Sequence, residues 1–500
     1  MRRLWYRSGG APRVGDVTTT TRPSRTRPRL RTRTRPRTAP AQALGSPGLF
    51  TVLLGAALPL VDFFIVNVAL PSIGRDLGAG EALLELFVAG YGLAYAVLLV
   101  LGGRLGDLFG RRRLFLTGLV AFSVTSLLCG LAPSAWALVA ARVAQGAAAA
   151  LLLPQVLATL HSSTTGARRA RAMGLYGATT GLAFVSGQIL GGLLVAADVA
   201  GLGWRAVFLV NVPAVLLVLP LALRTVPETR AAAPAPLDVR GTVLLALALV
   251  SLLAPLTEGR AAGWPLWTWG ALAAFPLLAA AFWRTERRTE LRGGTPLVPP
   301  SLLRLTPLRR GLVLVLPLSG GFGGFILVIA VALQQGLELG PVAAGAALAP
   351  MALAFFAASL AGPRLVARWG TRVIPAGAVV QAAGLGMLAW TAAHSWPDVT
   401  PWALAPGMAV AGVGQGLQLP VLFRVVLAEV PADRAGVGSG VMVTTQQSAL
   451  ALGVATLGSL FLTLAADGSM GTALATTLLI QLALSLLTAL YALRLPRATG

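Results

Sequence analysis

Long apolar runs recur along this chain from residue 49 almost to its end, and they strongly restrict its fold. Each run is close to the 20 residues that an α helix needs to cross the hydrocarbon core of a bilayer. Because a spanning segment has to satisfy its own backbone polar groups, such runs predict helices. The runs cover residues 49–71, 83–103, 114–132, 136–160, 172–195, 205–223, 240–257, 267–283, 311–335, 342–363, 372–393, 402–425, 438–463 and 471–493. The sequence therefore predicts an all-α integral membrane protein with fourteen transmembrane helices.

The composition supports a membrane setting. Hydrophobic residues make up 56% of the chain and charged residues 11%, which is atypical of a soluble protein. A net charge of +23 would indicate nucleic acid binding in a soluble chain. Here the arginines gather between apolar runs, so we expect a lipid bilayer and no nucleic acid as partner. Cys129 and two histidines in expected loops, His161 and His394, give no metal-ligand spacing, so no metal or cofactor is expected.

Arginine also predicts the orientation of the chain. The loops after the even-numbered runs are rich in arginine, whereas the other loops carry at most Arg75, Arg205 and Arg260. Arginine accumulates on the cytoplasmic side of membrane proteins. We therefore expect a multi-pass protein of the cell membrane with both termini in the cytoplasm.

Residues 1–48 differ from the rest of the chain. They hold 12 arginines, one acid, Asp16, and almost no aliphatic run, so a disordered cytoplasmic tail is expected. A twin-arginine signal at Arg2–Arg3 is disfavoured because no apolar segment follows within reach. The tail could rest on anionic lipid, where each arginine contributes about 1 kcal/mol. We favour the alternative of a non-essential extension from an upstream start codon.

An arginine-rich segment, residues 103–113 (GRLGDLFGRRR), predicts a tight cytoplasmic loop between the second and third runs. Part of it returns 260 residues later without a gap. The matching positions are Arg104, Leu105, Gly110 and Arg112 in the first copy and Arg364, Leu365, Gly370 and Arg372 in the second. Such a repeat indicates two related halves, with runs 1–6 matching runs 9–14 and runs 7 and 8 inserted between them.

This segment resembles the signature loop of the major facilitator superfamily, and the run count resembles its fourteen-span drug:proton antiporter branch. The resemblance covers roughly residues 49–495 and implies two six-helix bundles plus two inserted helices. The chain then divides into a tail (1–48), an N-terminal bundle (49–224), the inserted helices (225–310) and a C-terminal bundle (311–494). The resemblance also implies a conformational latch, in which Asp107 approaches residues 436–440 at the start of span 13. The latch residues are Gly103, Arg104, Gly106, Asp107, Gly110, Arg111 and Arg112.

Two ionisable residues fall inside runs of the first half. Asp62 belongs to a stretch, residues 60–71, that resembles the first-helix motif of the branch. An ionisable group in a spanning helix is expensive and commonly functional, and apolar surroundings disfavour its charged form, which suits a proton carrier. Arg142 resembles the arginine of the span-4 motif R-x-x-Q-G, which is implicated in proton coupling, and it needs an acceptor such as Asp62. The alternatives are a structural carboxylate and an ion pair that only packs helices.

Further polar and small residues fall inside the runs. Gly187, Gln188, Gly191 and Gly192 resemble the exporter motif G-P-x-x-G-G, with glutamine in place of the proline. The substitution removes the expected kink and weakens the inference of export, but small residues still allow close helix packing. Several uncharged polar residues inside runs either line a cavity or bond across helices: Asn67, Gln145, Gln334, Gln335, Gln418, Gln446 and Gln447.

No nucleotide-binding loop or catalytic triad occurs in the sequence, so we expect a transporter driven by an ion gradient and not an enzyme. We predict a monomeric, proton-coupled exporter of amphipathic or lipophilic small molecules, with its substrate site between the bundles near the bilayer midplane. One alternative is a proton-coupled uptake carrier for a nutrient. The other is a membrane receptor or scaffold that does not transport.

Overall fold

The computed structural model describes residues 44–229, 237–259, 262–427, 429–431 and 434–495, so most of the predicted tail lies outside it. A helix forms at each predicted apolar run, and no strand occurs in the described ranges. The α helices are α1 (Ser46–Leu77), α2 (Glu81–Phe109), α3 (Arg111–Gly130), α4 (Ala135–Ser163), α5 (Gly166–Ala197), α6 (Ala206–Leu209), α7 (Asn211–Thr225), α8 (Val239–Glu258), α9 (Leu266–Leu291), α10 (Thr306–Val331), α11 (Pro341–Ala347), α12 (Ala349–Trp369), α13 (Val373–Ser395), α14 (Pro401–Leu427), α15 (Ala435–Gly453), α16 (Ser459–Asp467) and α17 (Met470–Ala492).

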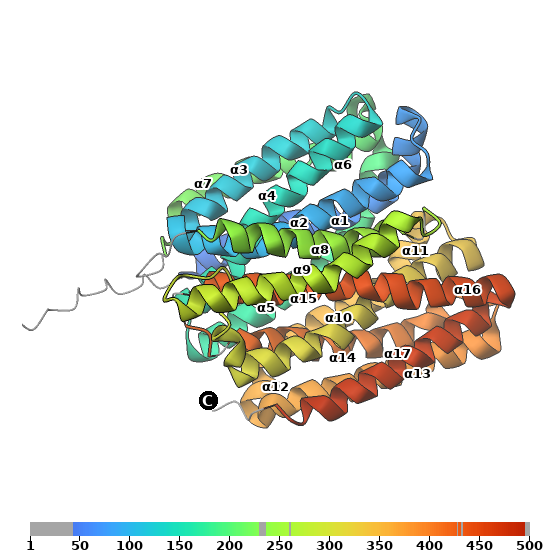
Figure 1. Cartoon of the computed structure of the whole chain (residues 1–500). Coiled ribbons are helices and arrows are strands. Elements are labelled where there is room, and N and C mark those ends of the chain that lie inside the picture. Colours follow the sequence, from blue (N-terminus) through green and yellow to red (C-terminus); the bar gives the residue numbers. More distant parts are fainter. Residues whose placement is uncertain (1–43, 230–236, 260–261, 428, 432–433, 496–500) are drawn as a thin grey trace, which may run out of the picture. The chain divides into compact units, whose positions relative to one another are not determined.

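Two groups of helices pack with the same pattern of contacts (Figure 1). In the first group, α4 packs against α2 and α3, α5 against α1, and α7 against α3. In the second group, α14 packs against α12 and α13, α15 against α10, and α17 against α13. The groups meet where α2 packs against α15 and where α5 packs against α12. The contact pattern therefore repeats along the chain in the same order as the duplicated arginine-rich segment.

Helices α8 and α9 lie between the two groups in the sequence and side by side in space (Figure 1). α8 also contacts α2 and α15. α9 carries large apolar side chains on its surface, including Leu266, Trp267, Trp269 and Leu277. Apolar side chains exposed on a long helix can contact lipid tails favourably. The α8–α9 pair is therefore suited to the lipid-facing edge of a membrane protein.

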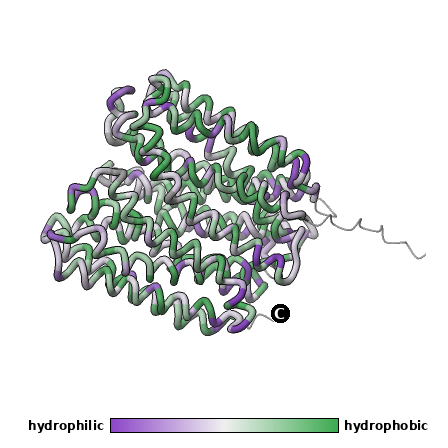
Figure 2. The backbone as a smooth tube through the Cα atoms, turned by 180° about the vertical axis from the view of Figure 1, so that it is seen from behind, coloured by the Kyte–Doolittle hydropathy of each residue, from purple (hydrophilic) through white to green (hydrophobic). Residues whose placement is uncertain are grey.

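Twelve segments of the described chain are long and apolar enough to cross a membrane. One of them, residues 349–395, contains both α12 and α13, and α5 is not among the twelve. The predicted count of fourteen spans is therefore not confirmed. Hydrophobic residues follow the bodies of the helices, and hydrophilic residues gather toward their ends (Figure 2).

The prediction of a loop at residues 103–113 is wrong in its local structure. α2 continues to Phe109 and α3 begins at Arg111, so Gly110 alone separates the two helices. Its φ of 106° lies in a region that favours glycine, which lets a single residue make the turn. The second copy turns at Gly370, whose φ is 61°. The predicted loop positions of the histidines are wrong as well, because α4 and α13 continue far enough to include His161 and His394.

Candidate functional site

Asp62 lies at the middle of α1 and has no exposed surface. Its Oδ2 is 2.6 Å from Nη1 of Arg142 on α4, which confirms the predicted pairing of these two residues. Its Oδ1 accepts hydrogen bonds from Nε2 of Gln145 at 2.9 Å and from Nδ2 of Asn211 at 2.7 Å. Both carboxylate oxygens thus have donors, as a buried ion pair requires.

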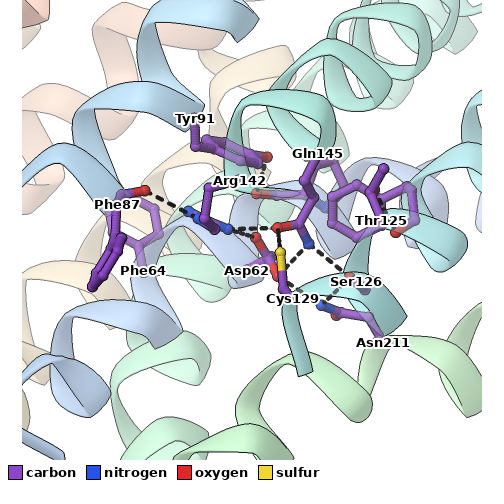
Figure 3. A network of polar contacts seen from close by, with 12 residues as sticks. Asp62, Phe64, Phe87, Tyr91, Thr125, Ser126, Cys129, Arg142, Gln145 and Asn211 are labelled. Carbon is purple, nitrogen blue, oxygen red and sulfur yellow. Dashed lines mark hydrogen bonds and ion pairs between the residues drawn. The ribbon is translucent and has the colours of Figure 1, made fainter. Parts of the chain in front are cut away.

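A network of side chains joins this pair to α3 and α7 (Figure 3). Oγ of Ser126 accepts hydrogen bonds from Gln145 at 2.6 Å and from Asn211 at 3.0 Å. Oε1 of Gln145 accepts from Arg142 at 2.7 Å and from the thiol of Cys129 at 3.4 Å. Gln145 therefore bonds across helices. Sequence reasoning assigned no role to Asn211 or Ser126, although each is a polar residue inside an apolar run.

The guanidinium of Arg142 is enclosed by α2 as well. Its Nε donates to the carbonyl oxygen of Phe87 at 3.1 Å, and its central carbon lies 4.3 Å from the centroid of the Tyr91 ring. Nη2 is buried and has no hydrogen-bond partner in the part of the chain that the structure describes. Removing one partner of such a buried pair typically costs about 3–5 kcal/mol, because the other charge remains.

A cavity of about 140 Å³ lies between the two groups of helices. Pro59 and Tyr91 belong both to its wall and to the surroundings of the ion pair. The wall is mostly apolar, and no charged side chain of the described residues lines it. Its aromatic residues are Phe63, Phe64, Tyr91, Tyr95, Tyr176, Phe322, Phe355 and Phe423.

The polar side chains in the cavity wall are Thr180, Ser319, Gln415, Gln446 and Gln447. Oγ of Ser319 and Oε1 of Gln415 are buried without a partner among the described atoms. Buried polar atoms of this kind are usually satisfied by water or by a ligand. The site can therefore hold an aromatic molecule and accept or donate a few hydrogen bonds.

The structure distributes the other predicted cavity residues differently. Gln447 lies in the wall of the central cavity. Gln418 instead donates to Gln381 at 2.7 Å and borders a separate small pocket. Asn67, Gln334 and Gln335 are exposed and are not among the residues that line the central cavity. The sequence gives the position of an uncharged polar residue along a helix but not the side of the helix that meets the cavity.

The glycines of the motif on α5 bring that helix against α1 next to Asp62. A Cβ atom on Gly187 would lie 2.9 Å from the carbonyl oxygen of Val61, and one on Gly191 would lie 2.8 Å from that of Ile65. Gly192 is buried in the same helix, which also contains Gln188. The small residues thus hold α5 close to the helix that carries the acid.

Comparison with known families gives a decisive match. The sequence model of the Major Facilitator Superfamily matches residues 52–454, which include the Asp62 network and most of both helix groups. The chain belongs to the Major Facilitator Superfamily. Proteins of this superfamily are membrane transporters and bind small molecules within the bilayer, so the chain is a multi-pass membrane protein and not an enzyme.

Similar superfamily members include exporters of natural products. The probable actinorhodin transporter of Streptomyces coelicolor is 39% identical over 412 residues, which cover 82% of this chain and 71% of the relative. The tetracenomycin C resistance and export protein of Streptomyces glaucescens is 35% identical over 419 residues, covering 83% of this chain and 75% of the relative. The crystal structure of the human organic anion transporter MFSD10 shares the fold at 17% identity, with a TM-score of 0.66. The match covers 89% of this chain and 99% of the MFSD10 chain.

The superfamily's signature segment lies where α2 crosses α15. The oxygens of Asp107 accept hydrogen bonds from the backbone N–H groups of Gly436 and Val437, each at 3.3 Å. Nη2 of Arg111 donates to the same carboxylate at 2.7 Å. The predicted position of Asp107 at this helix start is confirmed. The positive end of a helix favours a carboxylate, so the contact stabilises the crossing of α2 and α15.

Glycines allow this crossing to form. A Cβ atom on Gly103 would lie 2.2 Å from the carbonyl oxygen of Gly436, and one on Gly436 would lie 2.3 Å from that of Gly103. Gly106 lies against a side chain instead, since a Cβ atom on it would be 1.9 Å from Oε1 of Gln155. The remaining latch residues are Arg104, which is buried, Gly110, which makes the turn, and Arg112, which donates to the carbonyl oxygen of Leu223.

Proposed function

We propose that the protein is a proton-coupled efflux transporter that exports drugs or natural products by alternating access. The observation that carries this proposal is the buried Asp62–Arg142 pair directly behind the aromatic wall of the central cavity. The relatives named for export of tetracenomycin C and transport of actinorhodin support export and a natural-product substrate.

The cavity supports an amphipathic or lipophilic aromatic substrate. Aromatic side chains prefer offset or edge-to-face contacts with other rings, and eight of them stand in this wall. Ser319 and Gln415 supply unpaired polar atoms for a hydroxyl or amide group of the substrate. A cavity between two repeated bundles is also the usual place for a transported substrate.

In the proposed cycle, Asp62 carries the proton. When Arg142 faces it, the carboxylate is charged and its proton has left. When the pair separates, the acid lies among apolar side chains and binds a proton from the open side of the membrane. The latch residues hold the cytoplasmic end shut through the Asp107 contact with α15 and release it when the other side closes.

The proposed architecture has fourteen spans. The segment of residues 349–395 contains two helices, and α5, with 32 residues, is long enough to cross and packs between α1 and α12. Two six-helix bundles, near 49–224 and 311–494, then flank the inserted pair α8 and α9. We propose a monomer with both termini in the cytoplasm, on the side of the arginine-rich segments.

Cysteine labelling tests this topology. On a Cys129→Ala background, single cysteines at Ala262 and His394 should react with an impermeant maleimide added to intact cells. Cysteines at Thr165 and Arg292 should react only after the membrane is opened. Reaction of an Ala262 cysteine from the cytoplasmic side alone would show that α8 and α9 do not cross as a pair, and would rule out the fourteen-span arrangement.

A transport assay tests the function. Cells that express the protein should accumulate several-fold less tetracenomycin C than cells without it, and the difference should vanish when a protonophore collapses the proton gradient. Higher accumulation in expressing cells would instead support an uptake carrier, an alternative left open because Gln188 replaces the proline of the exporter motif. Equal accumulation of this and other aromatic compounds would support the non-transporting alternative.

A further inference from the structure

Tyr91 on α2 belongs both to the cavity wall and to the surroundings of the ion pair. It lines the cavity beside Phe63 and Tyr95, whose ring centroids lie 5.8 Å and 6.3 Å from its own. Its ring also packs against the guanidinium of Arg142, with 4.3 Å between the central carbon and the ring centroid (Figure 3). One side chain therefore contacts the substrate space and the proton-coupling pair.

Two further contacts fix this arrangement. The Tyr91 hydroxyl donates to the carbonyl oxygen of Pro59 at 3.0 Å, three residues before Asp62 on α1. Nη2 of Arg142 is buried and has no hydrogen-bond partner in the described part of the chain. The face of the Tyr91 ring, and at 5.7 Å that of Phe208, supplies a compensating attraction to the guanidinium. Asp62 thus holds the guanidinium from one direction and Tyr91 holds it from another.

We propose that Tyr91 is a positioning residue that transmits occupancy of the cavity to the Asp62–Arg142 pair. This inference rests on the proposed function. An aromatic substrate stacked on the cavity side keeps the Tyr91 ring against Arg142, and Arg142 keeps Asp62 in its charged form. Without a substrate on its cavity side the ring is less restrained, so the contact that holds the guanidinium is weaker and Asp62 binds a proton from water more readily. Substrate binding then releases one proton, and substrate departure takes one up.

The chemistry around Asp62 makes it the source of the pH dependence. The charged and titratable side chains that face it are Arg142 from α4, Cys129 from α3 and Tyr91 from α2, and α7 adds the uncharged Asn211. Arginine stays charged, and thiols and phenols are ordinarily neutral below about pH 7.5. Among these described groups, Asp62 is therefore the carboxyl group that can exchange a proton.

Binding of the neutral fluorophore N-phenyl-1-naphthylamine to purified, full-length protein tests the proposal. If one proton leaves on binding, wild-type affinity should weaken by up to about tenfold per pH unit on the acid side of the Asp62 titration. Tyr91→Leu should reduce the change in affinity to less than about twofold per pH unit, because the ring that connects ligand and guanidinium is gone. Tyr91→Met is a second variant with a longer, unbranched and more adaptable side chain, should the leucine variant not fold.

Matched variants separate positioning from binding. Tyr91→Phe keeps the ring and should keep the pH dependence. Tyr95→Leu removes a neighbouring cavity ring and should weaken binding by the same factor at every pH.

Wild-type pH dependence in Tyr91→Leu or Tyr91→Met overturns only the inference about Tyr91. Binding by wild type that does not vary with pH overturns both this inference and proton coupling through Asp62. No binding by wild type contradicts the proposed substrate class, and the inference fails with it.

Discussion

Asp62→Asn is expected to abolish proton-driven efflux. Asparagine has nearly the shape of aspartate but binds no proton, so the transporter loses the group that is proposed to exchange one. Efflux of tetracenomycin C from expressing cells should fall to that of cells without the protein. In purified protein, adding substrate should no longer release protons, whereas the wild type should release them.

The substitution also leaves Arg142 as an unpaired buried charge, which typically costs about 3–5 kcal/mol of stability. The double variant Asp62→Asn/Arg142→Gln removes both charges and should recover much of this stability without recovering transport. Asp76→Asn is the matched control, because Asp76 lies on the same helix but is exposed and paired with Arg205. The Asp76→Asn variant should still export tetracenomycin C. If Asp62→Asn releases as many protons as wild type, another residue carries the proton.

Gly103→Val is expected to block the closed crossing of α2 and α15. The new Cβ would lie 2.2 Å from the carbonyl oxygen of Gly436, so one helix backbone has to move. Overpacking of this kind costs about 1–3 kcal/mol. An equal penalty on the closed state shifts the conformational equilibrium by about 5- to 150-fold. Transport should fall accordingly, and a cysteine placed at Thr180 in the cavity should become more reactive from the cytoplasmic side.

A smaller change at the same crossing should have a smaller effect. Asp107→Asn removes the charge from the start of α15, where the helix end stabilises a carboxylate by about 0.3–1 kcal/mol, so transport should fall about 2- to 5-fold with normal expression. Gly270→Val is the control for added bulk, because nothing lies within 4 Å of a Cβ on this residue of α9. Wild-type transport by Gly103→Val would contradict the role of the crossing.

The positions of the helices were predictable because length and hydropathy decide whether a segment can cross a bilayer. The helix ends were not. α1 continues through Pro71 to Leu77, so Asp62 lies about 22 Å from that end at 1.5 Å per residue. Counting only as far as Leu70 gives about 12 Å. Hydrogen bonding along the backbone extends a helix past the apolar run, and hydropathy does not register that extension.

The ion pair was predictable for a different reason. A charge inside a span is so costly that Asp62 and Arg142 required each other. Asn211, Ser126 and Tyr91 are neutral, so nothing in their chemistry fixes a partner in advance. Their roles follow from which helices meet, and that arrangement is a property of the folded chain.

The repeated contact pattern gives this protein two related crossings, α2 with α15 and α12 with α5, but they are not equivalent. Asp107 places a carboxylate at the start of α15, whereas the corresponding position in the second copy, 260 residues later, is Ala367. We therefore expect the two halves to contribute unequally to the energy of the proposed cycle. In the proposed cycle, the repeated fold provides two similar crossings, and a single acid in one copy favours the conformation in which that crossing is formed.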